Sequence, residues 1–118
     1  MDNKKIAALS AWGADTAAAI KRMLGDEDFY LGLIDAFLSN NDWRDLCTMI
    51  EKEQYRDAFV ISHRIKGSCA DLSLNPLFAV MCELTDDLRN EEIRPTLKKN
   101  YELANKIRDS LIETLQFK

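Results

Sequence analysis

The chain has 118 residues, of which 47% are hydrophobic, and this is enough for one domain with a single core that needs neither disulfides nor a metal. Its formal net charge of −4 makes it a poor candidate for binding a phosphate backbone, so no nucleic-acid partner is expected. No stretch reaches the roughly 18 to 20 apolar residues that span a bilayer, and residues 6–12 form too short an apolar stretch for a signal peptide. We therefore expect one domain over residues 1–118, in the cytoplasm and without a membrane partner.

The apolar residues recur at helical spacing, and no segment shows convincing strand alternation. The first predicted helix covers residues 16–24. Asp15 is placed to cap its start and Gly25 to end it.

A second helix is predicted to begin after its capping residue Asp26 and to run unbroken to about Lys52. The polar residues 39–42 offer an alternative, a break into two helices, because Asp42 is itself a plausible cap. A third helix is predicted over residues 54–72.

A turn at residues 73–75 leads into a fourth predicted helix, with Asn75 as its cap and Pro76 at its first position. Asn90 ends this helix, and a last helix begins near Pro95. Amphipathic helices with short connections predict an all-α fold, namely an antiparallel four-helix up-down bundle with a short additional N-terminal helix.

The only histidine of the chain, His63, lies in the third predicted helix. Since successive helical residues are rotated by about 100°, Ile61, Ile65 and Leu72 lie opposite His63 and form the expected core side. His63 is therefore predicted to point outward. The residues within about 60° of it share this outward direction, and they are Arg56, Phe59, Val60, Lys66, Gly67 and Ala70.

A single histidine is usually an ordinary surface residue, but its neighbours argue against that interpretation here. Gly67 lies in mid-helix, where glycine costs about 1 kcal/mol relative to alanine, and this indicates that something approaches closely. Phe59 and Val60 are apolar on an outward face, as in a docking surface. Lys66, one turn after His63, is placed to neutralise an oxyanion attached to the imidazole.

Neutral imidazole is a nucleophile near pH 7 because its ordinary pKa is about 6.5. It can take up a phosphoryl group and later return it. The sequence contains no P-loop, no glycine-rich kinase loop and no acidic metal cluster, so the chain is not expected to use ATP. We expect a phosphocarrier rather than an enzyme, with no cofactor of its own and with Mg²⁺ bound by its partner.

The segment Ser62-His63-Arg64-Ile65-Lys66-Gly67-Ser68-Cys69 resembles the pattern A-H-x-L-K-G-S/A-A of histidine-containing phosphotransfer (HPt) domains of bacterial two-component phosphorelays. The His, Lys and Gly match, whereas the Leu-Gly that often follows in the family is Leu72-Ser73 here. Residues 13–15 and 25–30 resemble the family's entry helix and the start of its second helix. The resemblance spans roughly residues 13–90.

The resemblance implies a phosphorelay intermediate whose partners are response-regulator receiver domains, with a hybrid sensor histidine kinase as a further candidate. His63 would accept a phosphoryl group from a receiver aspartate and pass it to the aspartate of another receiver. Lys66 would stabilise the phosphoryl oxygens, and Gly67 would let the receiver come close. The expected receiver-docking residues are Arg56, Phe59, Val60, Arg64, Ala70, Tyr30, Leu31 and Ile34, and for the last three ordinary core packing is the alternative.

Two features concern assembly. The chain is expected to be a monomer, because the face around His63 must stay free for the receiver. It is also expected to be a standalone protein that begins at Met1, rather than a domain cut from a hybrid sensor kinase.

The main alternative function is a non-catalytic helical interaction module, and phosphoryl acceptance at His63 distinguishes the two. A metal site is disfavoured because Cys69 lies about 120° around the helix from His63, so the two side chains do not converge. The three cysteines (Cys47, Cys69 and Cys82) are expected to be small core residues. The carboxylates at residues 86–87 and 91–92 are expected to be solvated helix ends.

Overall fold

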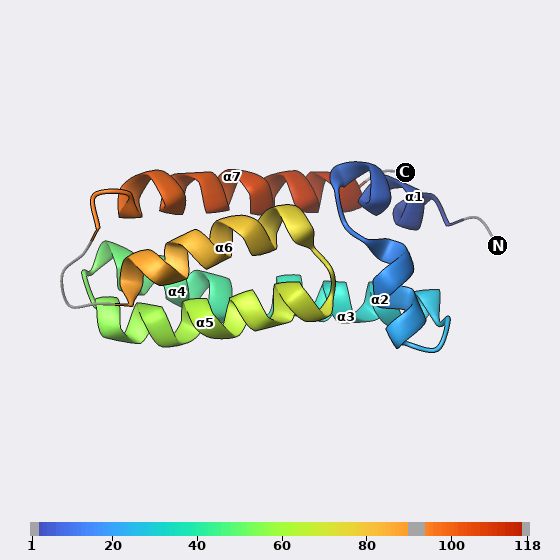
Figure 1. The fold of residues 1–118 in the computed structure, drawn as a ribbon, viewed down its shortest axis with the longest axis horizontal. Helices are drawn as coiled ribbons and strands as arrows, with labels where there is room; N and C mark the ends of the chain where they lie inside the picture. Colours follow the sequence, from blue (N-terminus) through green and yellow to red (C-terminus); the bar gives the residue numbers. More distant parts are fainter. Residues whose placement is uncertain (1–2, 90–93, 117–118) are drawn as a thin grey trace.

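The computed structural model describes residues 3–89 and 94–116, and the regular structure in this part of the chain is entirely helical (Figure 1). The prediction of an all-α fold is confirmed. None of the described helices is both long and apolar enough to cross a membrane. The helices are, in chain order, α1 (Lys4–Trp12), α2 (Thr16–Arg22), α3 (Glu27–Ser39), α4 (Asp42–Glu51), α5 (Tyr55–Asp71), α6 (Asn75–Leu88) and α7 (Leu97–Leu115).

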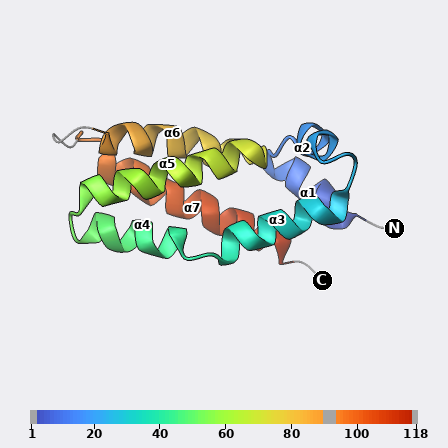
Figure 2. The same cartoon turned by 90° about the horizontal axis from the view of Figure 1, so that it is seen from below.

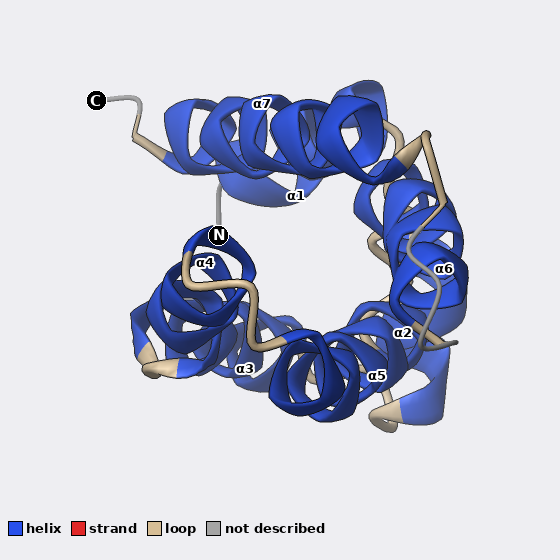
Figure 3. Ribbon diagram, turned by 90° about the vertical axis from the view of Figure 1, so that its left-hand side faces the viewer, coloured by secondary structure: helices blue, strands red, loops and turns tan. Residues whose placement is uncertain are grey.

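The longer helices surround one core. α4 packs on α5, α5 on α6, and α6 on α7. Helices α5, α6 and α7 run in alternating directions, while α3 and α4 follow one another along the remaining side (Figures 1 and 2). The end view shows these helices arranged around a common interior (Figure 3). Buried apolar side chains form the core between them, among them Leu46, Ile65, Leu84 and Leu111. Burying each of these side chains contributes about 1.5–3 kcal/mol.

The caps predicted for the first two helices are present. Asp15 accepts a hydrogen bond from the backbone N–H of Ala18 at 3.1 Å, and Asp26 accepts one from Phe29 at 2.9 Å. Helix α2 ends at Arg22, two residues before the predicted end, and the chain then turns through positive φ at Leu24 (+58°) as well as at Gly25 (+83°). The two aspartate caps therefore set the starts of α2 and α3, whereas Gly25 lies in the turn after α2 and does not itself end the helix.

The second predicted helix is not continuous, so the prediction of an unbroken helix was wrong and the break at residues 39–42 is present. Distant side chains stabilise the break. Arg108 of α7 donates a hydrogen bond to the carbonyl oxygen of Leu38 at 3.1 Å, near the end of α3. Arg64 of α5 donates two hydrogen bonds to Asp42, the first residue of α4, at 2.8 and 2.9 Å. Arg108 thus binds a backbone carbonyl that the break leaves without a helical partner, and Arg64 fixes the side chain that begins α4.

The start of α6 differs slightly from the expectation. Asn75 is the first residue of the helix rather than its cap, and Leu74 occupies the cap position without a capping side chain. Pro76 lies in the first turn, as predicted. Helix α7 begins at Leu97, shortly after Pro95. The expected end at Asn90 lies outside the described residues.

Helix α1 was not predicted as a helix. It packs on α7, and Trp12 donates a hydrogen bond from its indole nitrogen to the hydroxyl of Ser110 at 2.9 Å. Gly13 ends α1 with a φ of +123° and lies so close to Pro76 that a β-carbon on Gly13 would be 2.7 Å from the proline Cγ. The turn between α1 and α2 therefore needs a glycine for two separate reasons.

Replacing Gly13 with alanine is expected to lower the free energy of unfolding by about 1–3 kcal/mol, because the new methyl group collides with a rigid ring and the φ angle is unfavourable. Gly32 is the matched control, since it lies inside α3 and a β-carbon there would have no atom within 4 Å. Gly32→Ala is expected to stabilise by about 0.5–1 kcal/mol. Urea unfolding measures both, and a stable Gly13→Ala protein would contradict this packing.

The carboxylates at residues 86–87 were predicted to be solvated at a helix end, and for Asp87 this prediction is wrong. Asp87 is only 1% exposed, and its carboxylate accepts hydrogen bonds from Thr96 at 2.5 Å and from Asn100 at 2.7 Å. Its neighbour Asp86 is partly exposed and pairs with Arg89 at 3.2 Å, as a helix end would. Asp87 thus joins the end of α6 to the start of α7, while residues 91–92 lie outside the described part of the chain.

Candidate functional site

His63 lies in the middle of α5 and is exposed, as predicted. In the described part of the chain no hydrogen bond or ion pair engages its imidazole, and the one ring contact is with Phe59, at 6.1 Å between centroids. The opposite side of α5 is buried, and it carries Ala58, Ile61, Ile65 and Cys69. Both ring nitrogens are therefore available to a molecule outside the chain.

The rotation of α5 about its axis is fixed by its buried side. Ser62 is fully buried and shares a hydrogen bond of 2.6 Å with Thr85 of α6, which is also fully buried. A buried hydroxyl without this partner would cost about 1–3 kcal/mol, so the helix cannot rotate freely. With Ser62 turned toward α6, the next residue, His63, is turned to the surface.

Gly67 follows His63 by one helical turn and has no structural role that requires glycine. It is exposed, its backbone is helical, and a β-carbon there would have no atom within 4 Å. The chain thus carries the cost of a helical glycine, about 1 kcal/mol, without a gain in its own packing. Open space beside His63 is what the glycine provides.

Substitution of Gly67 separates its effect on stability from its effect on close approach. Gly67→Ala is expected to stabilise the fold by about 0.5–1 kcal/mol. On the sequence-based expectation that His63 exchanges a phosphoryl group with a receiver, Gly67→Glu and Gly67→Arg should both slow that exchange at least about tenfold, since a long side chain of either charge blocks the approach. The matched controls are Ala7→Glu and Ala7→Arg, at an exposed position on α1. Unchanged transfer in both Gly67 variants would show that nothing approaches closely there.

The charged residues around His63 divide into free and paired groups. Among the described residues, Arg56 and Lys66 form no ion pair or hydrogen bond. Arg64 is exposed, but its guanidinium is held by Asp42, and this hydrogen bonding lowers the pKa of the Asp42 carboxyl below its ordinary value. Arg56 and Lys66 are therefore the cations available to an incoming anion, and Arg64 first has to leave Asp42.

Two of the expected docking residues on α3 are core residues, so that part of the prediction was wrong. Tyr30 and Ile34 are fully buried, and the Tyr30 hydroxyl donates a hydrogen bond to the carbonyl oxygen of Leu72 at 2.8 Å. Burial raises the pKa of Tyr30 to about 12. Leu31 is partly buried against the core. A partner cannot reach Tyr30 or Ile34 without unfolding α3.

The exposed side of α3 carries different residues, which the sequence analysis missed. Phe29 is 53% exposed, and Leu33 and Phe37 line a groove of about 410 Å³ that continues to Ser68 and Asp71 of α5. The spacing of these residues by four is the signal that indicates one helix face. This groove adjoins the Gly67 side of α5.

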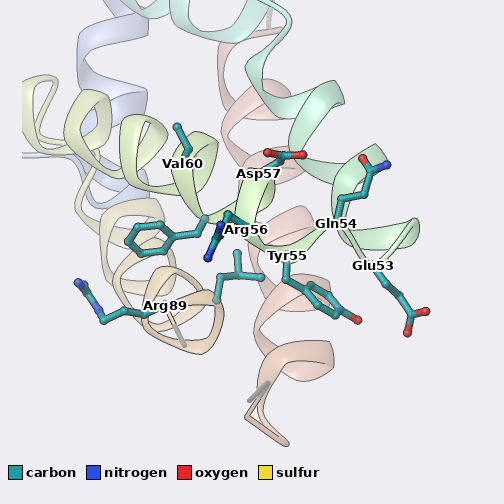
Figure 4. A pocket seen from close by; sticks show the side chains of 9 residues that line it. Glu53, Gln54, Tyr55, Arg56, Asp57, Val60 and Arg89 are labelled. Carbon is teal, nitrogen blue, oxygen red and sulfur yellow. The ribbon is translucent and has the colours of Figure 1, made fainter. Parts of the chain in front are cut away.

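A second groove, of about 580 Å³, lies between the start of α5 and the end of α6. Phe59, Val60 and Leu88 provide its apolar lining, and Arg56 and Arg89 its cations (Figure 4). Leu88 and Arg89 were not among the predicted site residues, because the end of α6 meets Phe59 only in three dimensions, where the Arg89 guanidinium lies 5.4 Å from the centroid of the Phe59 ring.

Ser73 stands at the end of α5, where the HPt pattern often has a glycine after leucine. Ser73 has a φ of +53°, a conformation that favours glycine, and it is held there by Arg22 of α2. The Arg22 guanidinium donates hydrogen bonds to the Ser73 hydroxyl at 2.8 Å and to the carbonyl oxygen of Asp71 at 2.7 Å. A serine thus replaces the glycine at the end of the helix, away from the imidazole.

The cysteines do not converge on His63. Cys69 is buried on the opposite side of α5, and burial raises its pKa to about 12, whereas Cys47 and Cys82 are partly buried. In the described ranges no three His, Cys, Asp or Glu side chains are grouped so that they could hold a metal ion.

Comparison with protein-family models, with curated proteins and with solved structures found no match to this chain. The functional assignment therefore depends on the residues around His63 themselves.

Proposed function

We propose that the chain is a phosphocarrier of the HPt type, which accepts a phosphoryl group from a receiver-domain aspartate onto His63 and passes it to another receiver aspartate. In this proposal α3 with α4, α5, α6 and α7 form the antiparallel four-helix up-down bundle, and α1 and α2 are additions at its end. The observation that carries the proposal is the exposed imidazole of His63, which no other described side chain binds, beside a glycine that the fold does not need.

The proposed phosphoryl transfer needs only one reacting group from this chain, the imidazole of His63. Neutral imidazole with its proton on Nδ1 has a lone pair on Nε2, which attacks the phosphorus of the aspartyl phosphate. An N–P bond forms, the P–O bond to the aspartyl oxygen breaks, and the receiver recovers its carboxylate. Because the attacking nitrogen carries no proton, no general base is needed, which is consistent with the absence of a carboxylate bound to His63 in the described residues.

Charge stabilisation and positioning account for the rest of the catalysis. Lys66 lies one turn after His63 and is unpaired among the described residues, so its ammonium is free to stabilise the phosphoryl oxygens. The Mg²⁺ and the acidic pocket that such a transfer uses belong to the receiver. The reaction is reversible, since aspartyl phosphate and phosphohistidine exchange through the same geometry.

The proposed docking surface is the outward face of α5 together with the exposed side of α3. On α5 it includes Arg56, Phe59, Val60, Gly67 and Ala70, which are at least partly exposed. On α3 it includes Phe29 and Leu33 in place of Tyr30 and Ile34, with Leu31 as a partly buried neighbour. Val60 and Phe29 are 56% and 53% exposed, a degree of exposure that apolar docking residues show.

Discharge of phosphorylated protein tests the carrier function. The chain is first loaded chemically with phosphoramidate, and its single histidine is identified as the site by phosphorus NMR. Receiver domains from the same organism are then added with Mg²⁺. We expect at least one receiver to remove the phosphoryl group much faster than water does. If every receiver leaves phosphorylated His63 to slow hydrolysis, the carrier function is refuted and a non-catalytic interaction module becomes the better description.

A further inference from the structure

Arg64 directly follows His63 on α5, and its guanidinium is bound to the start of α4. Its Nε and one terminal nitrogen donate hydrogen bonds to the two carboxylate oxygens of Asp42, at 2.9 and 2.8 Å. Such a bidentate pair fixes the orientation of the guanidinium. The cation that adjoins the imidazole in the sequence is therefore occupied while His63 is unmodified.

This ion pair is exposed, so it can exchange partners readily. The side chains of Arg64 and Asp42 are 56% and 25% exposed, and an exposed pair contributes little because water solvates both charges. Asp42 is also the first residue of α4, where the N-terminal end of a helix favours a negative charge. The carboxylate thus keeps a favourable environment when the arginine leaves.

A phosphoryl group on His63 would have a cation on each flank. Because successive helical residues are rotated by about 100°, Arg64 lies about 100° from His63 on the α4 side, and Lys66 lies about 60° from it on the other side. The phosphoryl group brings about two negative charges and three acceptor oxygens, whereas Asp42 brings one charge. A guanidinium binds phosphate in the same bidentate way as carboxylate. The phosphoryl group is therefore the stronger acceptor for Arg64.

Gly67 leaves the space between Arg64 and His63 open. Residues three and four apart are neighbours on a helix surface, so position 67 adjoins both of them. Helical side chains lean toward the N-terminus of their helix, and a side chain at position 67 would therefore cover the region between Arg64 and His63. A β-carbon there would have no atom within 4 Å. The guanidinium thus has room to move from Asp42 to a group on the imidazole.

We infer that Arg64 is a phosphoryl-binding residue that acts only in the loaded chain: Asp42 holds it while His63 is unmodified, and it moves to the phosphoryl oxygens once His63 is phosphorylated. The inference rests on the proposed function for its biological role, which is to retain the phosphoryl group after the donor has left. It also separates Arg64 from Lys66, whose ammonium is available before and after loading. No covalent bond changes in this step, since one ion pair replaces another.

Titration of the phosphoryl group tests this exchange. The full chain is loaded with phosphoramidate, and the pKa of the phosphohistidine is read from its phosphorus resonance. A nearby cation favours loss of a proton, so Arg64→Ala is expected to raise this pKa by about 0.2–0.7, as an exposed ion pair would. Asp42→Asn is expected to lower it, because Arg64 then has no competing partner. Arg44→Ala is the matched control, since it removes an exposed α4 arginine from its pair with Asp45, and it should leave the titration unchanged.

A double variant distinguishes the exchange from a general effect of charge. If Asp42 acts through Arg64, Asp42→Asn shifts the pKa of the phosphohistidine in the wild-type background but not in Arg64→Ala. An equal shift in both backgrounds would overturn the inference, and so would an Arg64→Ala protein that titrates like the wild type.

The test is independent of receivers, because phosphoramidate supplies the phosphoryl group. If Arg64 shifts the titration while no receiver discharges phosphorylated His63, the contact of Arg64 with the phosphoryl group stands and the carrier function falls. If receivers discharge the chain while the Arg64 variant titrates like the wild type, the carrier function stands and the exchange is refuted. Proton–nitrogen NMR gives the direct signature. The Nε–H resonance of Arg64, which reports its bond to Asp42, is expected to move when the wild type is loaded and to stay in place in His63→Gln.

Discussion

Replacing His63 with glutamine should abolish phosphorylation of the chain and leave its fold intact. The loss is expected to be complete, from up to one phosphoryl group per chain to background, because the sequence contains no other histidine. The free energy of unfolding should change by no more than about 0.5 kcal/mol, since the imidazole is exposed and forms no hydrogen bond or ion pair with any described residue. Phosphorus NMR after loading with phosphoramidate measures the first effect, and thermal unfolding the second.

The result that would support His63 as the phosphoryl acceptor is a His63→Gln protein that is folded but accepts no phosphoryl group. A His63→Gln protein that still accepts an acid-labile phosphoryl group would remove His63 from the mechanism. A His63→Gln protein that unfolds would show instead that the imidazole has a structural role, which its exposure does not indicate.

Replacing Asp87 with alanine should cause a loss of stability of about 2–4 kcal/mol. The carboxylate is 1% exposed and accepts hydrogen bonds from Thr96 and Asn100. Its removal leaves the amide of Asn100, a residue that is only 8% exposed, without its acceptor, and a buried unsatisfied polar group is costly. Urea unfolding measures this loss directly.

Asp86→Ala is the matched control, because it removes the same side chain one position earlier. Asp86 and Arg89 have side chains that are 45% and 50% exposed, so their ion pair contributes no more than about 1 kcal/mol. We expect Asp86→Ala to lie close to wild type. Equal stability of the Asp86 and Asp87 variants would contradict the proposed link between α6 and α7.

The orientation of α5 could be predicted from the sequence because its two sides differ clearly. Ile61 and Ile65 lie opposite His63, whereas Arg56, Lys66 and Gly67 share its side, so the helical period predicts which side is buried even though Phe59 and Val60 are also on the outward side. The structure places all of these residues as expected. The same local reasoning predicted the caps at Asp15 and Asp26.

The orientation of α3 could not be predicted in the same way. Residues 29–38 are almost entirely apolar, so a period of 3.6 residues does not distinguish a buried side from an exposed one. Tertiary packing decides the outcome, because the Tyr30 hydroxyl finds its acceptor at the end of α5. The exposed side, with Phe29 and Leu33, then follows from that one contact.

The break between α3 and α4, the burial of Asp87 and helix α1 were not predicted for one common reason. Each depends on a contact with a residue that is far away in the sequence. The break between α3 and α4 depends on Arg64 and Arg108. The burial of Asp87 depends on Asn100 of α7, and nothing in the local sequence distinguishes Asp87 from Asp86. Helix α1 likewise depends on contact with α7, where Trp12 reaches Ser110.

Direct transfer from a receiver is the measurement that tests the account most closely. A receiver domain carrying a radiolabelled phosphoryl group on its aspartate is mixed with the chain and Mg²⁺, and each receiver of the organism is tried in turn. The account predicts label on the chain that is labile to acid and stable to base, as phosphohistidine is, and that is absent from His63→Gln. A folded wild-type chain that takes up no label from any receiver would contradict it.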